Sequence, residues 1–92
     1  MKWSMRLRVA RQAGLMDSMA RRTQVDQLAL VRENRGRTFA AARRDCLECR
    51  HDAECARWLH TAPPGARPPE FCPNANLFAR FRAEPEAVVS RD

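Results

Sequence analysis

Two segments of the sequence stand out: D-C-L-E-C-R-H-D-A-E-C-A-R-W-L-H, residues 45–60, and F-C-P-N, residues 71–74. The two segments contain all four cysteines of the chain, in the spacing C-x2-C-x5-C-x16-C: Cys46, Cys49, Cys55 and Cys72. A C-x2-C pair places two sulfurs on one centre, and two further cysteines complete a four-sulfur shell. The pattern therefore predicts a four-thiolate metal site, with the rest of the chain packed around it.

The length and composition predict one small helical domain. Ninety-two residues allow a single core of modest size, to which a metal or disulfides would add stability. The chain has six prolines and no tyrosine, and no window shows the sustained alternation of a sheet. We expect an all-α fold of four or five short helices with a Pro-rich loop, closed around the cysteines. The helical four-cysteine domain would span 14–82, between a basic N-terminal extension at 1–13 and a disordered tail at 83–92.

Apolar residues at helical spacing predict helices over 15–20, 25–32, 39–49, 53–60 and 75–82. Asn34-Arg35-Gly36 is a stop signal, and Thr38 and Asn74 are expected to be N-caps. Residues 61–73 hold five prolines and predict an extended loop. On the last helix, the expected apolar face is Leu77, Phe78 and Phe81.

The same spacing predicts where each cysteine lies. Cys46 and Cys49 would share the inward face of the 39–49 helix, whereas Cys55 would lie about half a turn away if that helix continued. The chain should therefore break near 50–51, with Asp52 as the N-cap of the next helix. Cys55 would then lie in a first turn, where backbone N–H groups and the helix dipole stabilise a thiolate. The residues expected to pack against the site are Trp58, Leu59 and Phe71.

The donor set indicates the class of metal. Thiolates suit iron–sulfur clusters and zinc, whereas hard cations prefer oxygen ligands. One C-x2-C pair followed by single ligands, with a proline after the last cysteine, favours a cluster, [4Fe–4S] over [2Fe–2S]. Zinc is the alternative, and His51 could replace a thiol as ligand. A third interpretation treats the cysteines as small buried hydrophobic residues without a metal.

The charge of the chain is concentrated in its first half. Residues 1–45 carry eleven basic groups against four acids, a net +7, and residues 46–92 carry six against seven, a net −1. Such a surface suits nucleic acid or an acidic protein partner, with an anionic membrane surface as a further candidate. The arginines expected to make that contact are Arg6, Arg8, Arg11, Arg21, Arg22, Arg43 and Arg44. The sixteen arginines against one lysine also match the coding bias of a G+C-rich genome, which weakens this signal.

Several classes of protein are disfavoured by the sequence. No apolar run approaches the ~20 residues of a membrane span, and Arg6, Arg8 and Arg11 interrupt any signal peptide. We expect a cytoplasmic protein, in which close cysteines bind metal more often than they form disulfides. Neither a phosphate loop nor a dinucleotide fingerprint is present, and C-L-E-C lacks the strand–helix context of a thioredoxin. The chain is therefore not expected to be an enzyme or to take a small-molecule substrate.

Two resemblances rest on these motifs. The segments C-L-E-C-R-H-D-A-E-C-A-R-W-L and P-P-E-F-C-P-N-A-N-L-F, preceded by G-L-M-D-S-M-A, resemble small bacterial proteins of the domain of unknown function 6455 family. That resemblance covers about 14–82 and implies a shared cysteine pattern but no established activity. The C-x2-C-x5-C segment is also similar to the cluster-binding core of WhiB-like iron–sulfur regulators. Those proteins place the remaining cysteine upstream, whereas Cys72 lies downstream, and this chain lacks their Gly-Trp-rich turn and basic C-terminal tail.

Together, these observations predict a four-cysteine module, with an iron–sulfur cluster favoured, that acts as a redox- or iron-responsive or regulatory interaction protein. The alternative is a structural zinc module whose basic N-terminal half binds nucleic acid or an acidic protein partner.

Overall fold

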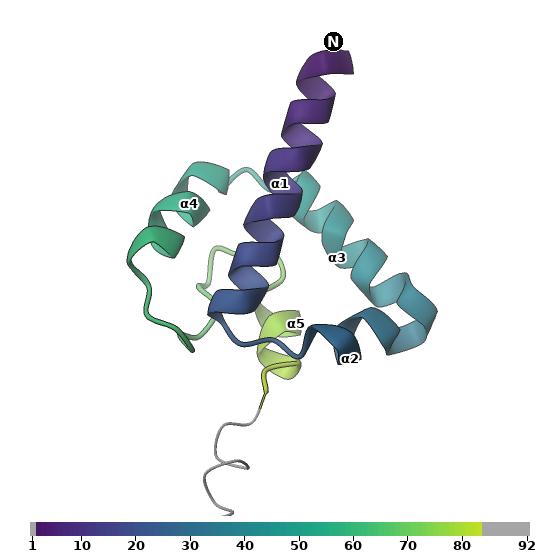
Figure 1. The fold of residues 1–92 in the computed structure, drawn as a ribbon, viewed down its shortest axis with the longest axis vertical. Helices are drawn as coiled ribbons and strands as arrows, with labels where there is room; N and C mark the ends of the chain where they lie inside the picture. The colour runs from purple at the N-terminus through teal and green to yellow at the C-terminus, as the bar shows by residue number, and fades with distance from the viewer. Residues whose placement is uncertain (1, 84–92) are drawn as a thin grey trace, which may run out of the picture.

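The computed structural model describes residues 2–83, with side chains from Ser4 onward, and shows an all-α fold (Figure 1). Its elements are α1 (Lys2–Arg22), α2 (Gln27–Arg32), the 3-10 turn η1 (Glu33–Gly36), α3 (Arg37–Leu47), α4 (Asp52–Thr61) and α5 (Ala75–Arg80). The only strand-like pairing within residues 2–83 is one antiparallel bridge between Val25 and Arg82. The all-α prediction is confirmed, but α1, with 21 residues, is not a short helix.

Helix α1 is the central element of the fold. It packs against both α3 and α4, which lie on opposite sides of it, and its N-terminal end projects beyond the other helices (Figure 1). Helix α5 lies near the C-terminal end of α1. Residues from five segments fill the core, namely Met16, Met19, Ala20, Val25, Leu30, Ala42 and Phe78. Met16 and Met19 are buried, in agreement with the apolar residues at helical spacing that predict a helix over 15–20.

Gly14 does not separate an extension from the domain. It lies inside α1, and the predicted boundary between 13 and 14 therefore falls within a continuous helix. Residues N-terminal to that boundary are docked: Gln12 is 1% exposed, Arg8 bonds to Leu47 at the end of α3, and Arg11 bonds to Asp52 at the start of α4. The predicted tail lies outside the described residues, apart from Ala83, whose N–H donates to the carbonyl of Gln24.

Replacing Gly14 with alanine should stabilise the protein. A Cβ at this exposed position would meet no atom within 4 Å, and alanine costs less backbone entropy than glycine in a helix. The expected gain is about 0.5–1 kcal/mol. Thermal unfolding followed by circular dichroism would measure it, with the exposed Ser18→Ala on the same helix as the comparison. A lower midpoint for Gly14→Ala would mean that α1 is not continuous in solution.

The turn between α2 and α3 reverses the chain through three left-handed residues. Asn34, Arg35 and Gly36 have φ values of 49°, 57° and 88°, which confirms the predicted stop signal. Helix α3 then begins at Arg37 with Gly36 at the N-cap position, so the prediction that Thr38 caps this helix is wrong. The glycine fits because it adopts a positive φ without steric cost.

The Pro-rich segment between α4 and α5 is non-helical, as predicted, and is fastened to the body of the protein. The Arg22 guanidinium donates to the Ala62 carbonyl at 2.9 Å, and the Gly65 N–H donates to the Arg22 carbonyl at 2.7 Å. Asn74 stands at the N-cap position of α5 but makes no side-chain cap bond. Its buried amide instead donates to the Ala42 carbonyl in α3, at 2.9 Å. Asn74 therefore joins the loop to α3 rather than capping α5.

Candidate metal centre

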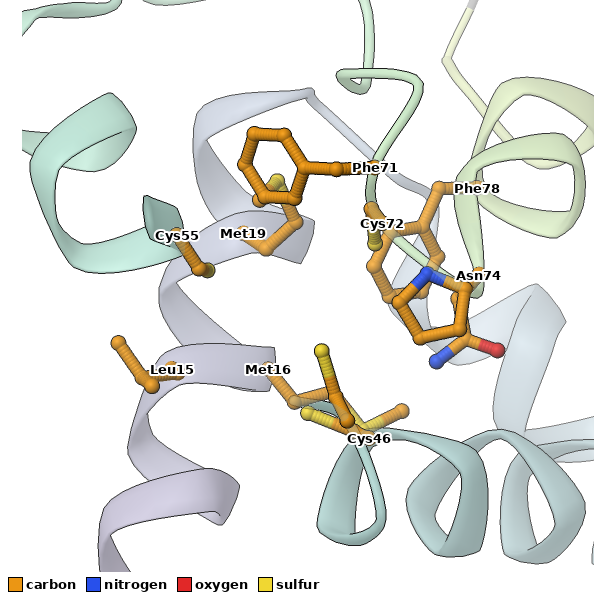
Figure 2. A pocket seen from close by; sticks show the side chains of 11 residues that line it. Leu15, Met16, Met19, Cys46, Cys55, Phe71, Cys72, Asn74 and Phe78 are labelled. Carbon is orange, nitrogen blue, oxygen red and sulfur yellow. The ribbon is translucent and has the colours of Figure 1, made fainter. Parts of the chain in front are cut away.

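All four cysteines line one pocket between α1, α3, α4 and the segment before α5. Cys46 is in the last turn of α3, Cys49 follows that helix, Cys55 is in the first turn of α4, and Cys72 ends the Pro-rich loop. Figure 2 shows Cys46, Cys55 and Cys72 approaching the pocket from three different segments. The other lining residues are apolar, apart from one amide: Leu15, Met16, Met19, Phe71, Pro73, Asn74 and Phe78.

The thiols surround this pocket without forming a ligand shell. Within residues 2–83, no three His, Cys, Asp or Glu side chains are placed to hold one metal ion. The structure therefore brings the predicted ligands to one pocket, but the prediction that the fold closes around a formed four-cysteine site is not shown. All four cysteines are free and half-buried.

The position of Cys49 differs from the prediction. Helix α3 ends at Leu47, so Cys49 lies in the following turn and not on the inward helix face, with its N–H bonded to the Cys46 carbonyl at 3.1 Å. The end of α3 is stabilised from α1: the Arg8 guanidinium donates to the carbonyls of Leu47 (2.9 Å) and Cys49 (3.4 Å). The carbonyls in the last turn of a helix lack helical partners, and a cation there also complements the dipole. Arg8 accordingly positions the C-x2-C segment.

Gln12 is the second positioning residue, and the sequence analysis missed it. Its amide nitrogen donates to the Cys46 carbonyl at 2.8 Å, and its own backbone carbonyl accepts from the Cys46 thiol at 3.5 Å. The side chain is buried and its Oε1 has no partner among the described residues. Gln12 lies four and seven residues before the buried Met16 and Met19. A polar residue on an inward helical stripe was the signal that could have revealed it.

Helix α4 begins one residue earlier than the sequence predicts. The break at 50–51 is confirmed, but Asp52 is the first helical residue and His51 the N-cap. The Asp52 carboxylate accepts a charged hydrogen bond from Arg11 at 3.2 Å. Burial raises the pKa of Asp52, but a backbone hydrogen bond and the Arg11 and Arg8 guanidinium groups outweigh it and lower the pKa. The ion pair between Asp52 and Arg11 therefore links α4 to α1 close to Cys55.

The other predicted site residues divide into two groups. Phe71 lines the pocket, whereas Trp58 and Leu59 pack against the hydrophobic core and are not among the lining residues. His51 is exposed and also does not line it; its Nδ1 lies 3.0 Å from a Glu54 carboxylate oxygen. Its ring centroid is 5.8 Å from that of Phe71.

Burial disfavours the thiolate form of three of the four cysteines, Cys46, Cys55 and Cys72. Burial, with the neighbouring cysteines, raises the pKa of Cys46 to about 11 and that of Cys55 to about 12. Burial also raises the pKa of Cys72, although a hydrogen bond from the Asn74 backbone N–H lowers it in part. Cys55 lies in the first turn of α4, as predicted, but burial raises its pKa, so the predicted stabilisation of its thiolate is not shown. Like-charge repulsion between thiolates disfavours ionisation, and a bound cation would remove that repulsion.

Hydrogen bonds restrain three of the four sulfurs. The His51 N–H donates to Cys49 Sγ at 3.3 Å, and the Asn74 N–H bonds to the Cys72 sulfur. The Cys46 thiol, as above, donates to Gln12. Backbone N–H groups directed at sulfur stabilise thiolate ligands and tune the potential of the metal that they hold.

The size of the pocket bears on which group it could hold. Its cavity volume of about 20 Å³ corresponds to about one water-sized sphere. A single zinc ion would fit that volume and the donor set. An iron–sulfur cluster fits the donor set, but the lining would have to move outward.

Most of the arginines expected to contact a partner bind within the chain. Besides Arg8 and Arg11, Arg21 pairs with Asp17, and Arg22 bonds to the Pro-rich segment. The Arg43 guanidinium lies over the Phe39 ring, 5.0 Å from its centroid. Arg6 and Arg44 are exposed. Several arginines of the basic half of the chain therefore make contacts within the protein.

The metal-free protein should lose stability as the pH rises above 9. The unfolded thiols lose their protons near 9.0, whereas folded Cys46 and Cys55 keep theirs up to about 11 and 12. Between these values the folded state binds more protons, so the free energy of unfolding falls with pH; below pH 9 this contribution is fully present. Thermal midpoints from pH 7 to 11 would measure the fall. The chain has no tyrosine and one lysine, so few other groups titrate in this window. A thermal midpoint that increases between pH 9 and pH 11 would contradict the raised pKa values of Cys46 and Cys55.

The fold and the pocket define a class: a small all-α protein whose four cysteines, from three segments, line one apolar pocket. The chain belongs to the Family of unknown function (DUF6455), whose family model matches residues 4–84. The match begins near the start of α1, not at about residue 14, in accord with the docking of Arg8, Arg11 and Gln12. No match to a curated protein or to a solved structure was found. The similarity to WhiB-like regulators receives no support from the comparison.

Within residues 2–83, α1 is the longest helix, and neither it nor any other helix is long and apolar enough to cross a bilayer.

Proposed function

We propose that this protein is a small metal-binding module in which Cys46, Cys49, Cys55 and Cys72 hold one metal centre. The first candidate for this centre is an iron–sulfur cluster. The module would act as a redox- or iron-responsive or regulatory interaction protein. The observation that carries the proposal is that the four cysteines of the chain, drawn from three segments, line the same apolar pocket. No catalytic role is proposed for the chain.

The chemistry of the donors supports a soft metal. Four sulfurs without an oxygen ligand match zinc or an iron–sulfur cluster and exclude magnesium or calcium as the preferred ion. When bound, a cluster would supply one-electron redox chemistry, whose potential depends on hydrogen bonds to sulfur and on exposure. The backbone N–H groups of His51 and Asn74 are such donors, and the apolar lining limits the access of water.

The supporting residues explain why a metal at this position would affect the whole fold. Gln12 and Arg8 hold the C-x2-C segment from α1, Arg11 holds the start of α4, and Asn74 holds the Cys72 segment against α3. A change in the ligand shell would therefore be transmitted to three helices. A protein partner that contacts these helices could detect it.

Zinc is the second candidate, and the cavity volume favours it. A space for about one water-sized sphere suits one ion better than a four-iron cluster. In that case the metal would only stabilise the fold, and the exposed basic groups would be the contact surface for nucleic acid or an acidic protein. Contact with nucleic acid would weaken steeply with salt.

The test is a metal analysis of protein purified without air. Broad absorbance near ~400 nm with about four iron and four sulfide per chain would support the cluster. One zinc per chain in colourless protein would support the second candidate. Folded protein that binds neither metal, even after reconstitution with iron and sulfide or with zinc, would overturn the proposal.

A further inference from the structure

The segment from α2 to α3 forms a corner at the edge of the protein, on the side of α1 away from α4 (Figure 1). Helix α2 packs against α3, and α3 packs against α1. The turn η1 between α2 and α3 has four residues and ends in Gly36, where a φ of 88° suits glycine. Two helices joined by a turn of about three or four residues that often contains glycine form a helix–turn–helix arrangement, whose second helix can enter a DNA groove. The outer face of α3 is therefore a candidate contact surface.

The outer face of α3 carries arginine and alanine. Ala42 faces inward and is 2% exposed. Four residues of the opposite face are exposed, namely Arg37, Ala40, Ala41 and Arg44. Their spacing of i, i+3, i+4 and i+7 places them on one stripe along the helix. Because the two alanines are short, the stripe allows the backbone of α3 to come close to a large ligand, with one guanidinium group at each end.

The corner is positively charged. Residues 27–44 carry five arginines against one acid, a net +4. The acid, Glu33, is already paired with Arg80 of α5 at 2.9 Å. Four of the arginines are exposed and form no ion pair within residues 2–83, namely Arg32, Arg35, Arg37 and Arg44. Guanidinium groups bind phosphate oxygens through paired hydrogen bonds, so the corner has the charge and the donors to bind a phosphate backbone.

Acidic residues mark the limits of this surface. Asp26, before α2, accepts a hydrogen bond from the Ala29 N–H at 3.1 Å. Asp45 and Glu48 are exposed at the C-terminal end of α3, close to Cys46 and Cys49 in the sequence. A polyanion is therefore attracted to the first two turns of α3 and to η1, and repelled from the end of α3 near the cysteines.

We infer that this corner binds double-stranded DNA, with α3 at the major groove and four arginines on the phosphates that border it: Arg32, Arg35, Arg37 and Arg44. The major groove of B-DNA, about 12 Å wide, admits a helix, whereas that of an RNA duplex is too narrow to be read by side chains. Single strands are bound through stacking on aromatic side chains, and the stripe on α3 has none. The surface supplies the nucleic-acid contact of the second proposed function, and it does not depend on which metal, if any, the cysteines hold.

Fluorescence anisotropy with a labelled DNA duplex of mixed sequence tests the assignment on the full-length protein, before and after removal of metal by a chelator. Four arginine–phosphate contacts give a slope of log K against log salt of about −3.6, so the affinity should fall about 150-fold between about 50 and 200 mM salt. Absence of binding at about 50 mM salt would overturn the inference. Tighter binding of duplex RNA or of single-stranded DNA would also overturn it. Tighter binding of polyglutamate would identify an acidic protein, which could also cover the exposed Leu28 and Val31, as the partner in place of DNA.

Paired substitutions test whether the corner makes the contact. Arg37→Gln combined with Arg44→Gln should weaken binding at least about tenfold at low salt and make the slope less negative by about 1.8. The matched control is Arg6→Gln combined with Arg57→Gln, an equal charge change at exposed positions of α1 and α4. The control should change the affinity less than about threefold, since salt screens exposed charges far from the DNA. Equal losses in the two proteins would overturn the assignment to this corner.

A substitution without a charge change tests the groove. Ala41→Phe adds bulk at an exposed position of the stripe and should weaken binding to duplex DNA, whereas Ala53→Phe, exposed on α4, should not. Unchanged binding by Ala41→Phe would overturn the placement of α3 in the groove. Circular dichroism confirms the fold of each variant, and metal content is measured on the same samples. Loss of DNA binding with metal present counts against this surface alone, whereas absence of metal with DNA binding retained counts against the metal centre alone.

Discussion

Replacing Cys55 with serine is expected to abolish stoichiometric metal binding and to lower the stability of the protein to that of its metal-free form. Serine has nearly the same shape, so the fold loses a ligand and little packing. A ligand that binds only the folded state at 1,000 times its dissociation constant adds about 4 kcal/mol. For a domain of this size that loss corresponds to about 15–30 °C in the midpoint of thermal unfolding.

The measurement is metal content together with thermal unfolding of the loaded protein, followed by circular dichroism. Ala56→Ser is the matched control, because it places the same hydroxyl one residue later on α4 at an exposed position outside the pocket. The control should keep its metal and midpoint. If Cys55→Ser keeps both as well, Cys55 is not a ligand and the four-cysteine assignment is wrong.

The effect should extend beyond α4 because the cysteines come from separate segments. Without a metal, the end of α3 and the start of α4 are joined through α1 by Arg8, Arg11 and Gln12, and the Cys72 segment is joined to α3 by Asn74. Site formation and folding are coupled when the ligands are brought together only in the folded state. In hydrogen exchange, amides of α4 and of the 62–74 segment should therefore lose protection in Cys55→Ser before those of α1.

Local signals predicted where elements end. The reversal at Asn34-Arg35-Gly36 could be predicted because the preferences of turn residues act over a few residues. The break at 50–51 could be predicted because the spacing of neighbouring cysteines fixes their positions around a helix. The apolar face of α5 was readable for the same reason, and Phe78 is indeed the most completely buried large side chain of that helix. Such features depend on backbone preference and helical period, which are properties of the local sequence.

Contacts between distant segments explain what the sequence did not reveal. Gly14 weakens α1 locally, by about 1 kcal/mol relative to alanine, and so looked like a boundary. The bonds from Arg8, Arg11 and Gln12 to residues 46–52 outweigh that penalty. The pKa of Cys55 also depends on distant residues, since burial and the other thiols raise it.

Phe78→Ala is expected to be the most destabilising substitution in the core. Phe78 is 1% exposed and lines two cavities, the cysteine pocket and a second one beside Phe39 and Arg43. Removal of a buried phenylalanine side chain costs about 3–5 kcal/mol, through lost burial and the cavity left behind. Because small domains have only about 5–15 kcal/mol in total, the metal-free variant should be close to unfolding at 37 °C.

Urea unfolding measures this loss, with Phe81→Ala as the matched control. Phe81 follows the same helix, is half-buried, and its ring lies under the Arg80 guanidinium, 4.9 Å from it. Its truncation leaves no enclosed cavity and should cost less than about 2 kcal/mol. Equal losses for the two variants would show that the core is not centred on Phe78.

Metal added to Phe78→Ala should restore stability if the pocket still closes, because a bound metal draws the α3, α4 and Cys72 segments together without help from the missing ring. If the metal binds but leaves the midpoint unchanged, the thiols close around it without ordering the core, and the coupling between the centre and the fold is absent.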